Sequence, residues 1–163
     1  MKPSTMTLRL AALASASALV LAACGGGDDD NTGDEDNDVA KGNGELVVGS
    51  LLPQTGSLAF LGPPEFAGVD LAVKEINEAG GVNGKDVKHV KGDSGDTDSG
   101  IAPAETDKLI KAGSDVIIGA ASSGVSMTVI DKIMSAGVVQ FSPANTSTAF
   151  DEPPYDKADL YFR

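Results

Sequence analysis

Aromatic residues, histidine and cysteine are all scarce in this chain of 163 residues. Only 4% of the residues are aromatic, tryptophan is absent, and Cys24 and His89 are the only residues of their kinds. A single cysteine excludes an intrachain disulfide. A single histidine also restricts serine-hydrolase chemistry, because an activated serine needs an imidazole base.

Basic residues are few as well: 12 Lys and Arg stand against 24 Asp and Glu, which gives a formal net charge of −12. Such an acidic surface repels phosphates, so we predict no nucleic-acid partner. Residues 28–38 hold six Asp, one Glu and no basic residue, and we interpret residues 24–44 as an acidic flexible tether. An EF-hand is rejected because Val39 stands where its closing glutamate belongs, and we predict no metal or cofactor.

The first 23 residues have the features of an export signal. Lys2 and Arg9 precede a short apolar run that ends in small residues and is too short to span a membrane comfortably. Residues 21–24, Leu-Ala-Ala-Cys, resemble the lipobox of bacterial lipoproteins. That resemblance implies cleavage before Cys24 and a diacylglycerol on its sulfur, which would anchor an extracytoplasmic protein to the membrane. A plain secreted protein with a free thiol is the alternative.

Strand and helix patterns alternate from Glu45 onward. We expect strands at 46–52, 86–91, 116–118, 138–141 and 159–162, and helices beginning at Pro63, at Ala102 and after Ser123. Their inward faces are expected to include Phe66, Val69, Val73 and Ile76 in the first helix, Leu109 and Ile110 in the second, and Val125, Val129 and Ile133 in the third. This alternation predicts an α/β fold, a parallel sheet flanked by helices on both faces.

Small and hydroxyl-bearing residues follow three of these strands. With a strand order of 2-1-3-4, loops 53–62 and 121–124 meet where the order reverses, which is the usual ligand position in such sheets. Loop 142–146 joins them on the same edge. We therefore expect a binding rim there.

The paired serines in the second loop allow three interpretations. Ser122 resembles the serine of a Gly-x-Ser-x-Gly nucleophile elbow, but His89 precedes it and is expected to be a surface residue in mid-strand. A serine is also a good helix cap. A second serine, Ser123, followed by Gly124, which would let a ligand approach the backbone, favours a carboxylate site at the helix N-terminus over a bare cap.

An ordered set of motifs carries a family resemblance over residues 45–163. The opening strand and its Ser/Thr-Gly loop (46–56), the segment 66–84, the strand 116–119 and the loop 142–146 resemble the leucine/isoleucine/valine-type substrate-binding proteins of ABC transporters. The resemblance implies the first lobe of a type 1 periplasmic-binding fold. It also implies a non-enzymatic receptor that delivers a branched-chain amino acid or similar small polar solute to a membrane permease. A ligand-sensing module of the same fold is the alternative, and a serine hydrolase is disfavoured.

The same resemblance implies a ligand site. By motif position, Ser123 and Thr146, beside Ser122, would hold the carboxylate and amino groups, and Ala144 would offer its carbonyl. Leu61, with Phe60 beside it, occupies the position of an aromatic residue that packs on the ligand side chain in the family.

The resemblance also predicts the domain organisation. Residues 1–23 would be a lipoprotein signal, 24–44 the tether and 45–163 an N-terminal lobe cut off inside its fifth strand. Because a small polar ligand gains most of its affinity from enclosure, we expect this part alone to bind poorly.

Overall fold

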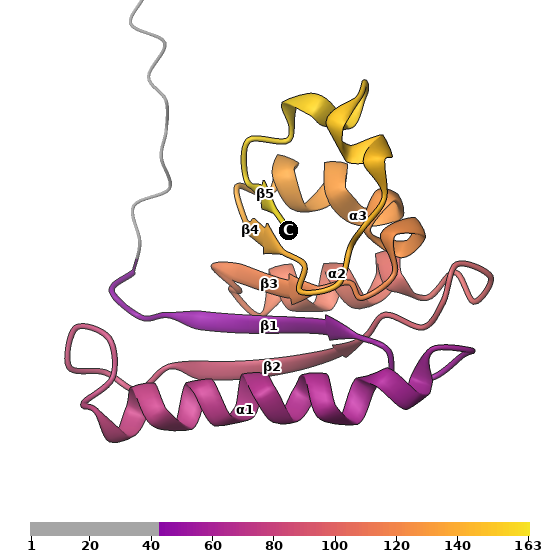
Figure 1. Cartoon of the computed structure of the whole chain (residues 1–163). Helices are drawn as coiled ribbons and strands as arrows, with labels where there is room; N and C mark the ends of the chain where they lie inside the picture. Colours follow the sequence, from indigo (N-terminus) through magenta and orange to yellow (C-terminus); the bar gives the residue numbers. More distant parts are fainter. Residues whose placement is uncertain (1–42) are drawn as a thin grey trace, which may run out of the picture. The chain divides into compact units, whose positions relative to one another are not determined.

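A computed structural model describes residues 43–163, so the expected export signal, Cys24 and most of the tether lie outside the described residues (Figure 1). The strands are β1 (Val47–Leu52), β2 (Lys88–Asp93), β3 (Val116–Gly119), β4 (Val139–Phe141) and β5 (Tyr161–Phe162). The helices are α1 (Gly62–Glu78), α2 (Ala102–Lys111) and α3 (Ser123–Ser135), with short 3-10 turns η1 (Ala59–Leu61), η2 (Thr148–Asp151) and η3 (Tyr155–Lys157). In this part of the chain, none of the helices has the length and apolarity to cross a membrane.

The five strands form one parallel sheet in the order β2-β1-β3-β4-β5. This confirms the predicted order of the first four strands and adds the fifth at the edge. All six residues of β1 are buried, as expected for a continuous apolar run in a central parallel strand. The predicted second strand was misplaced by two residues: β2 ends at Asp93, which pairs with Leu52 in register.

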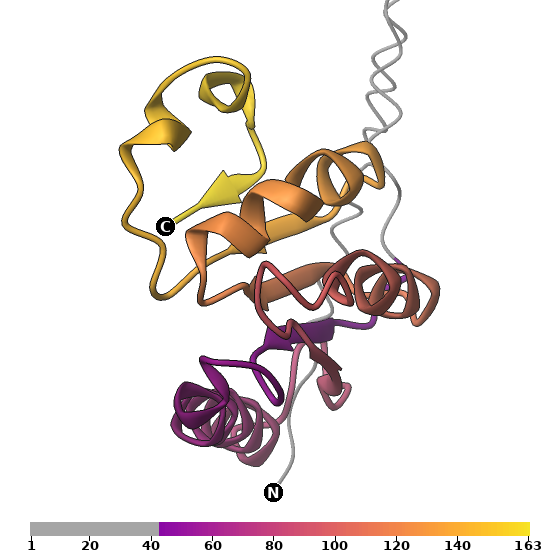
Figure 2. The ribbon, with the colours of Figure 1, turned by 90° about the vertical axis from the view of Figure 1, so that its right-hand side faces the viewer.

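Helices cover both faces of the sheet, as predicted. Seen end-on in Figure 2, α1 lies on one side and α2 and α3 on the other. The apolar core lies between the sheet and helices α2 and α3. It consists of Leu51, Ala102, Leu109, Ile117, Ala120, Val125, Val129, Ile133 and Val138. Full burial of each large aliphatic side chain stabilises the fold by about 1.5–3 kcal/mol. The inward positions predicted for α3 are all in this core.

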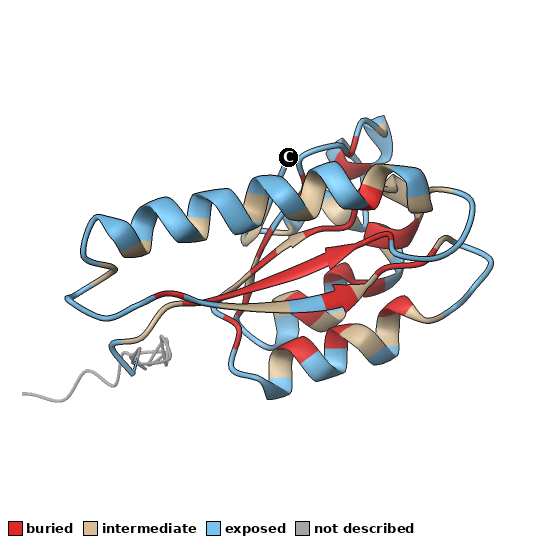
Figure 3. Cartoon of the chain, turned by 90° about the horizontal axis from the view of Figure 1, so that it is seen from below, coloured by how far each residue is buried: buried red, intermediate tan, exposed pale blue. Residues whose placement is uncertain are grey.

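The α1 face is covered less completely. Phe66, Val69 and Val73 are half-buried, and Ile76, predicted to face inward, is 37% exposed. Figure 3 shows most of the outer surface of α1 as exposed, above a largely buried sheet. The helix begins one residue earlier than predicted, at Gly62, with prolines in its first turn where a missing N–H costs no helical bond.

A row of polar side chains joins α1 to the sheet. His89 shares hydrogen bonds with Ser50 on one ring nitrogen and with Asp70 on the other, where Nδ1 lies 2.8 Å from Oδ1. Lys91 also donates to Asp70, at 2.6 Å, and these bonds from Lys91 and His89 lower the pKa of Asp70. The expectation that His89 is a surface residue was wrong: its side chain is 8% exposed, because α1 covers it.

Candidate ligand-binding rim

The rim forms because all strands run in the same direction, so their carboxyl ends meet at one edge of the sheet. β1 lies between β2 and β3, and the loops after these strands are therefore neighbours. The loop after β4 completes the row. The rim thus has two halves, one after β1 and β2 and the other after β3 and β4.

The two serines of the β3–α3 turn have different roles. Ser122 is the N-cap of α3, and its Oγ accepts a hydrogen bond from the backbone N–H of Val125 at 3.4 Å. Ser123 Oγ accepts from the backbone N–H groups of Thr146 and Ser147, at 3.2 and 3.3 Å. The structure therefore confirms the cap and brings Ser123 beside Thr146. Since both bonds use the oxygen as acceptor, the Ser123 hydroxyl hydrogen is left to donate.

A close contact within the protein leaves no space for a side chain at Gly124. A Cβ at this position would lie 2.6 Å from Cγ2 of Thr97, in the loop after β2. The Cβ side of Gly124 is thus occupied by a threonine methyl group. The glycine lets the loop after β2 pack closely against the first turn of α3.

Buried polar side chains fasten the turn after β3 to the loop after β4. The carbonyl oxygen of Ala120 accepts hydrogen bonds from Ser142 Oγ at 2.7 Å and from Asn145 Nδ2 at 3.0 Å. Asn145 Nδ2 also donates to the Ala121 carbonyl at 3.0 Å, and its Oδ1 accepts from the Tyr161 hydroxyl at 2.7 Å. Burial raises the pKa of Tyr161 to about 12, so this phenol stays a donor.

Sequence reasoning placed Asn145 on the rim without predicting this fastening role. The available signal was its spacing of three residues from Ser142, directly after a buried strand. Of the other predicted residues in this half, Ala144 and Thr146 are exposed.

A carboxylate fastens the loop after β1. Asp93, the last residue of β2, accepts from the backbone N–H groups of Gln54 at 2.8 Å and Thr55 at 3.2 Å and from the Thr55 hydroxyl at 2.6 Å. Burial alone would raise the pKa of Asp93. The bonds from Thr55, Gln54 and Gly95 outweigh burial and hold that pKa below its usual value.

A second carboxylate repeats the arrangement one turn further on. Asp96 accepts from the backbone N–H of Ser57 at 2.8 Å and of Ser99 at 3.0 Å, and these two bonds lower the pKa of Asp96. Gly56 has a φ of +83°, and a Cβ there would lie 2.4 Å from Asp96 Oδ2. Only glycine suits both the backbone conformation and the close approach of the carboxylate.

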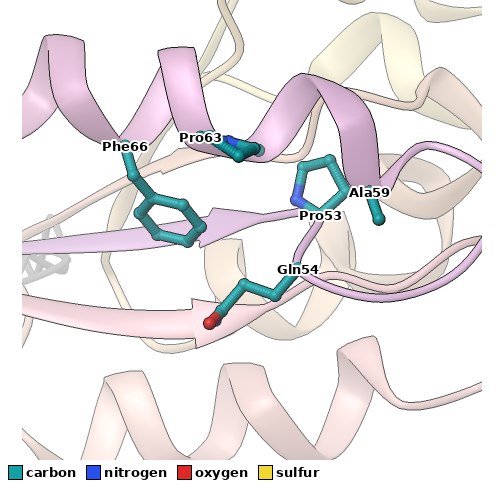
Figure 4. A pocket seen from close by; sticks show the side chains of 6 residues that line it. Pro53, Gln54, Ala59, Pro63 and Phe66 are labelled. Atoms are coloured by element: carbon teal, nitrogen blue, oxygen red, sulfur yellow. The ribbon is translucent and has the colours of Figure 1, made fainter.

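The two hydrophobic candidates lie on the short turn η1 in the same half. Phe60 is 71% exposed and Leu61 is half-buried. A neighbouring pocket of about 260 Å³ is lined by Pro53, Gln54, Ala59, Gly62, Pro63 and Phe66 (Figure 4). None of the predicted site residues lines this pocket.

Nothing in the described region supplies Ser122 with a catalytic base. The only histidine of the chain, His89, is held under α1 by Ser50 and Asp70, and Ser50 itself is fully buried. Residues 43–163 also contain no cluster of three or more His, Cys, Asp or Glu side chains that could hold a metal ion.

Comparison with known proteins identifies the family. Residues 45–158 match the family described as periplasmic binding protein. The chain belongs to the periplasmic binding protein family. This confirms the resemblance inferred from the motifs and, with the parallel sheet, the predicted fold class. Proteins of this family bind substrates rather than transform them.

Several relatives within the family are named for branched-chain amino acids or were solved with one bound. Leu/Ile/Val-binding protein homolog 2 of Brucella abortus is 37% identical over 109 residues, 66% of this chain and 29% of the relative. The branched-chain amino acid transporter substrate binding protein LivJ from Streptococcus pneumoniae, solved with isoleucine, superimposes with a TM-score of 0.65 at 31% identity. That match covers 72% of this chain and 33% of LivJ.

A substrate-binding protein from Desulfitobacterium hafniense, solved with leucine, gives a TM-score of 0.59 at 32% identity and covers 73% of this chain and 33% of that one. This chain therefore spans about a third or less of the length of the relatives it matches.

Proposed function

We propose that this family member is the N-terminal lobe of an extracytoplasmic substrate-binding component of an ABC importer, and that it binds a branched-chain amino acid or a similar small polar solute. The observation that carries the proposal is the juxtaposition of Ser123 and Thr146 at the N-terminus of α3, on the rim. Its partners would be the ligand and a membrane permease. Catalysis is not expected, since residues 43–163 place no base beside Ser122.

The chemistry of this corner suits an amino-acid carboxylate. The N-terminus of the 13-residue helix α3 carries unpaired backbone N–H groups and the positive end of the helix dipole. The Ser123 hydroxyl can donate to the same anion, while Thr146 and the carbonyl of Ala144 lie on the facing loop. Phe60 and Leu61 would meet the apolar side chain of the ligand once a second lobe encloses it.

The lipid anchor is a separate part of the proposal and rests on the Leu-Ala-Ala-Cys sequence at 21–24. The intact mass of the protein extracted from membranes should exceed that of the polypeptide from Cys24 onward by the mass of its acyl chains. A Cys24→Ala variant should appear in the soluble fraction. An unmodified Cys24 in the native protein would disprove the anchor and leave the ligand site untouched.

Ligand binding can be tested by NMR titration of the isotope-labelled full chain with leucine and with leucinol, which lacks the carboxylate. Leucine should shift the amides of Ser123, Gly124 and Thr146, and leucinol should not. Ser123→Ala should weaken leucine binding about tenfold, whereas Ser135→Ala, at the other end of α3, should not. Equal shifts from both ligands, or unchanged affinity in Ser123→Ala, would contradict the site.

A further inference from the structure

The turn between α1 and β2 lies at the edge of the sheet opposite the rim (Figure 1). Two main-chain hydrogen bonds close it, from the Val82 N–H to the Lys85 carbonyl at 2.8 Å and from the Lys85 N–H to the Val82 carbonyl at 3.0 Å. The two residues between them, Asn83 and Gly84, have φ values of +53° and +73°. Among the described residues, Asn83 is the only one other than glycine with a positive φ. Asn-Gly is the pair that such two-residue turns prefer, so the backbone explains its presence here.

The same pair places a side-chain amide next to a main-chain nitrogen that can attack it. Asn83 and Gly84 are both exposed, and within the described chain neither the Asn83 side chain nor the Gly84 N–H is held by a hydrogen bond. Apart from its chain neighbours, no described atom lies within 4 Å of the position that a Cβ of Gly84 would take, so its nitrogen is not crowded. An exposed turn closed by one residue pair opens at a small free-energy cost, which lets the two groups meet.

The other three asparagines of residues 43–163 are held by hydrogen bonds. Asn77 donates from Nδ2 to the Val87 carbonyl at 3.1 Å and accepts from the Val87 N–H on Oδ1 at 2.7 Å. Asn145 is buried, with both ends of its amide bonded. Asn43 also precedes a glycine, but its Oδ1 accepts from the main-chain N–H two residues on, at 2.8 Å. Asn83 is thus the asparagine of this region that combines a free amide with a following glycine.

We propose that Asn83 is a site of spontaneous deamidation, a covalent modification that does not rest on the proposed function. The Gly84 nitrogen loses its proton to hydroxide and attacks Cγ of Asn83. A bond forms between that nitrogen and Cγ as the Cγ–Nδ2 bond breaks, and Nδ2 takes a proton from water and leaves as ammonia. Water then opens the succinimide ring, at Cγ to give aspartate or at the main-chain carbonyl to give isoaspartate. Overall, water is consumed and ammonia is released, and no group is oxidised or reduced.

Isoaspartate does not fit this turn, because its main chain runs through Cβ and Cγ and is therefore longer. The arms of the turn lie so close together that a Cβ at Gly81 would be 2.0 Å from the Lys85 carbonyl oxygen. An additional main-chain carbon between Val82 and Lys85 separates that pair and opens the turn. The strand that follows is held independently, by the bonds of Asn77 to Val87 and by the pairing of β2 with β1. The modification therefore acts on the turn and leaves the rim at the opposite edge in place.

The first experiment follows the full chain during incubation at mildly alkaline pH. Trypsin cleaves after Lys74 and Lys85, so the peptide 75–85 contains Asn83 together with Asn77 as an internal control. Mass spectrometry should find the conversion of amide to acid on Asn83 and not on Asn77, at a rate within about tenfold of that in the free peptide 75–85. Asn83→Gln should prevent it, since its longer side chain requires a larger ring. An Asn83 that remains an amide in the folded chain while the free peptide converts would overturn the proposal.

Hydrogen exchange separates the effect of the longer main chain from that of the new charge. In the aged chain the Val82 and Lys85 amides should exchange about tenfold faster, and the Val87 amide should be unchanged. Freshly purified Asn83→Asp carries the charge without the additional main-chain carbon and should exchange as slowly as the unmodified protein. Equally fast exchange in Asn83→Asp would contradict the role given to isoaspartate. Neither measurement uses a ligand, so a failure to bind leucine would leave both results in force.

Discussion

The two halves of the rim are fastened by different chemistry. After β3 and β4, the uncharged side chains of Ser142 and Asn145 donate to main-chain carbonyls in a buried position. After β1 and β2, the carboxylates of Asp93 and Asp96 accept from main-chain amides near the surface. Both halves hold a loop at the end of a parallel strand. This depends on the protonation state of carboxylates in the half after β1 and β2, and not in the half after β3 and β4.

The largest effect is expected where the fastening is buried. Asn145→Ala removes the bonds to the carbonyls of Ala120 and Ala121 and leaves the Tyr161 hydroxyl without its acceptor. We expect a loss of about 3 kcal/mol in the free energy of unfolding, measured with urea. Asn145→Asp retains an acceptor for Tyr161 but turns a carboxylate oxygen toward the carbonyls of Ala120 and Ala121, so it should lose at least as much. A loss below about 1 kcal/mol in Asn145→Ala would show that this half is not held by Asn145.

Mutations in the carboxylate half should lower the free energy of unfolding by less. Asp93→Asn removes the charge that accepts from Gln54 and Thr55 and should cost about 1–2 kcal/mol, because charge-assisted bonds to an ionised acceptor are lost. The amides of Gln54 and Thr55 should exchange faster in this variant. Asp98→Asn, an exposed aspartate of the neighbouring loop, is the control. Equal stability of both variants would mean that Asp93 is not a fastener.

Lowering the pH should loosen the half after β1 and β2 and leave the half after β3 and β4 in place, without any mutation. The pKa values of Asp93 and Asp96 are lowered on folding, so their contribution to stability is complete above the ordinary aspartate value of 3.8 and is lost as pH falls through the lowered values. At a pH well below 3.8, protection of the Thr55 and Ser57 amides should fall, while that of the Asn145 amide persists. Parallel loss in both halves would remove the distinction.

The smallest effect concerns the helix cap. Ser122→Ala removes the bond to the Val125 N–H, which is long at 3.4 Å, and should cost about 0.5–1 kcal/mol. Ser123→Ala should instead loosen the Thr146 and Ser147 amides, which hydrogen exchange can detect residue by residue. If the two variants gave the same exchange pattern, the division of roles between the serines would be wrong.

The sheet could be predicted because its signals are local. The apolar run 46–52 and the short run before the serines identified β1 and β3, and the face of Val125, Val129 and Ile133 identified the buried side of α3. The Ser122 cap followed from its position before a helix. In each case the pattern and its structural consequence lie within one element.

The fasteners of the rim could not be predicted because they act between distant segments. Asp93 binds a loop 38 and 39 residues earlier in the chain, and only the register of β1 and β2 places Asp93 beside Leu52. His89 illustrates the same difficulty, since an edge-strand histidine is exposed unless a helix covers it. That cover depends on how α1 packs, which the alternation in β2 does not specify.

The hydrogen bonds of Asn145 have a consequence for which substitutions the rim tolerates. Asn145 bonds to the main-chain oxygens of Ala120 and Ala121, not to their side chains. A replacement of the exposed Ala144 leaves both acceptors in place, whereas Ala120 and Ala121 are buried and leave little room for a larger side chain. The side chain at this exposed position can therefore vary while the anchoring of the loop by Asn145 stays the same.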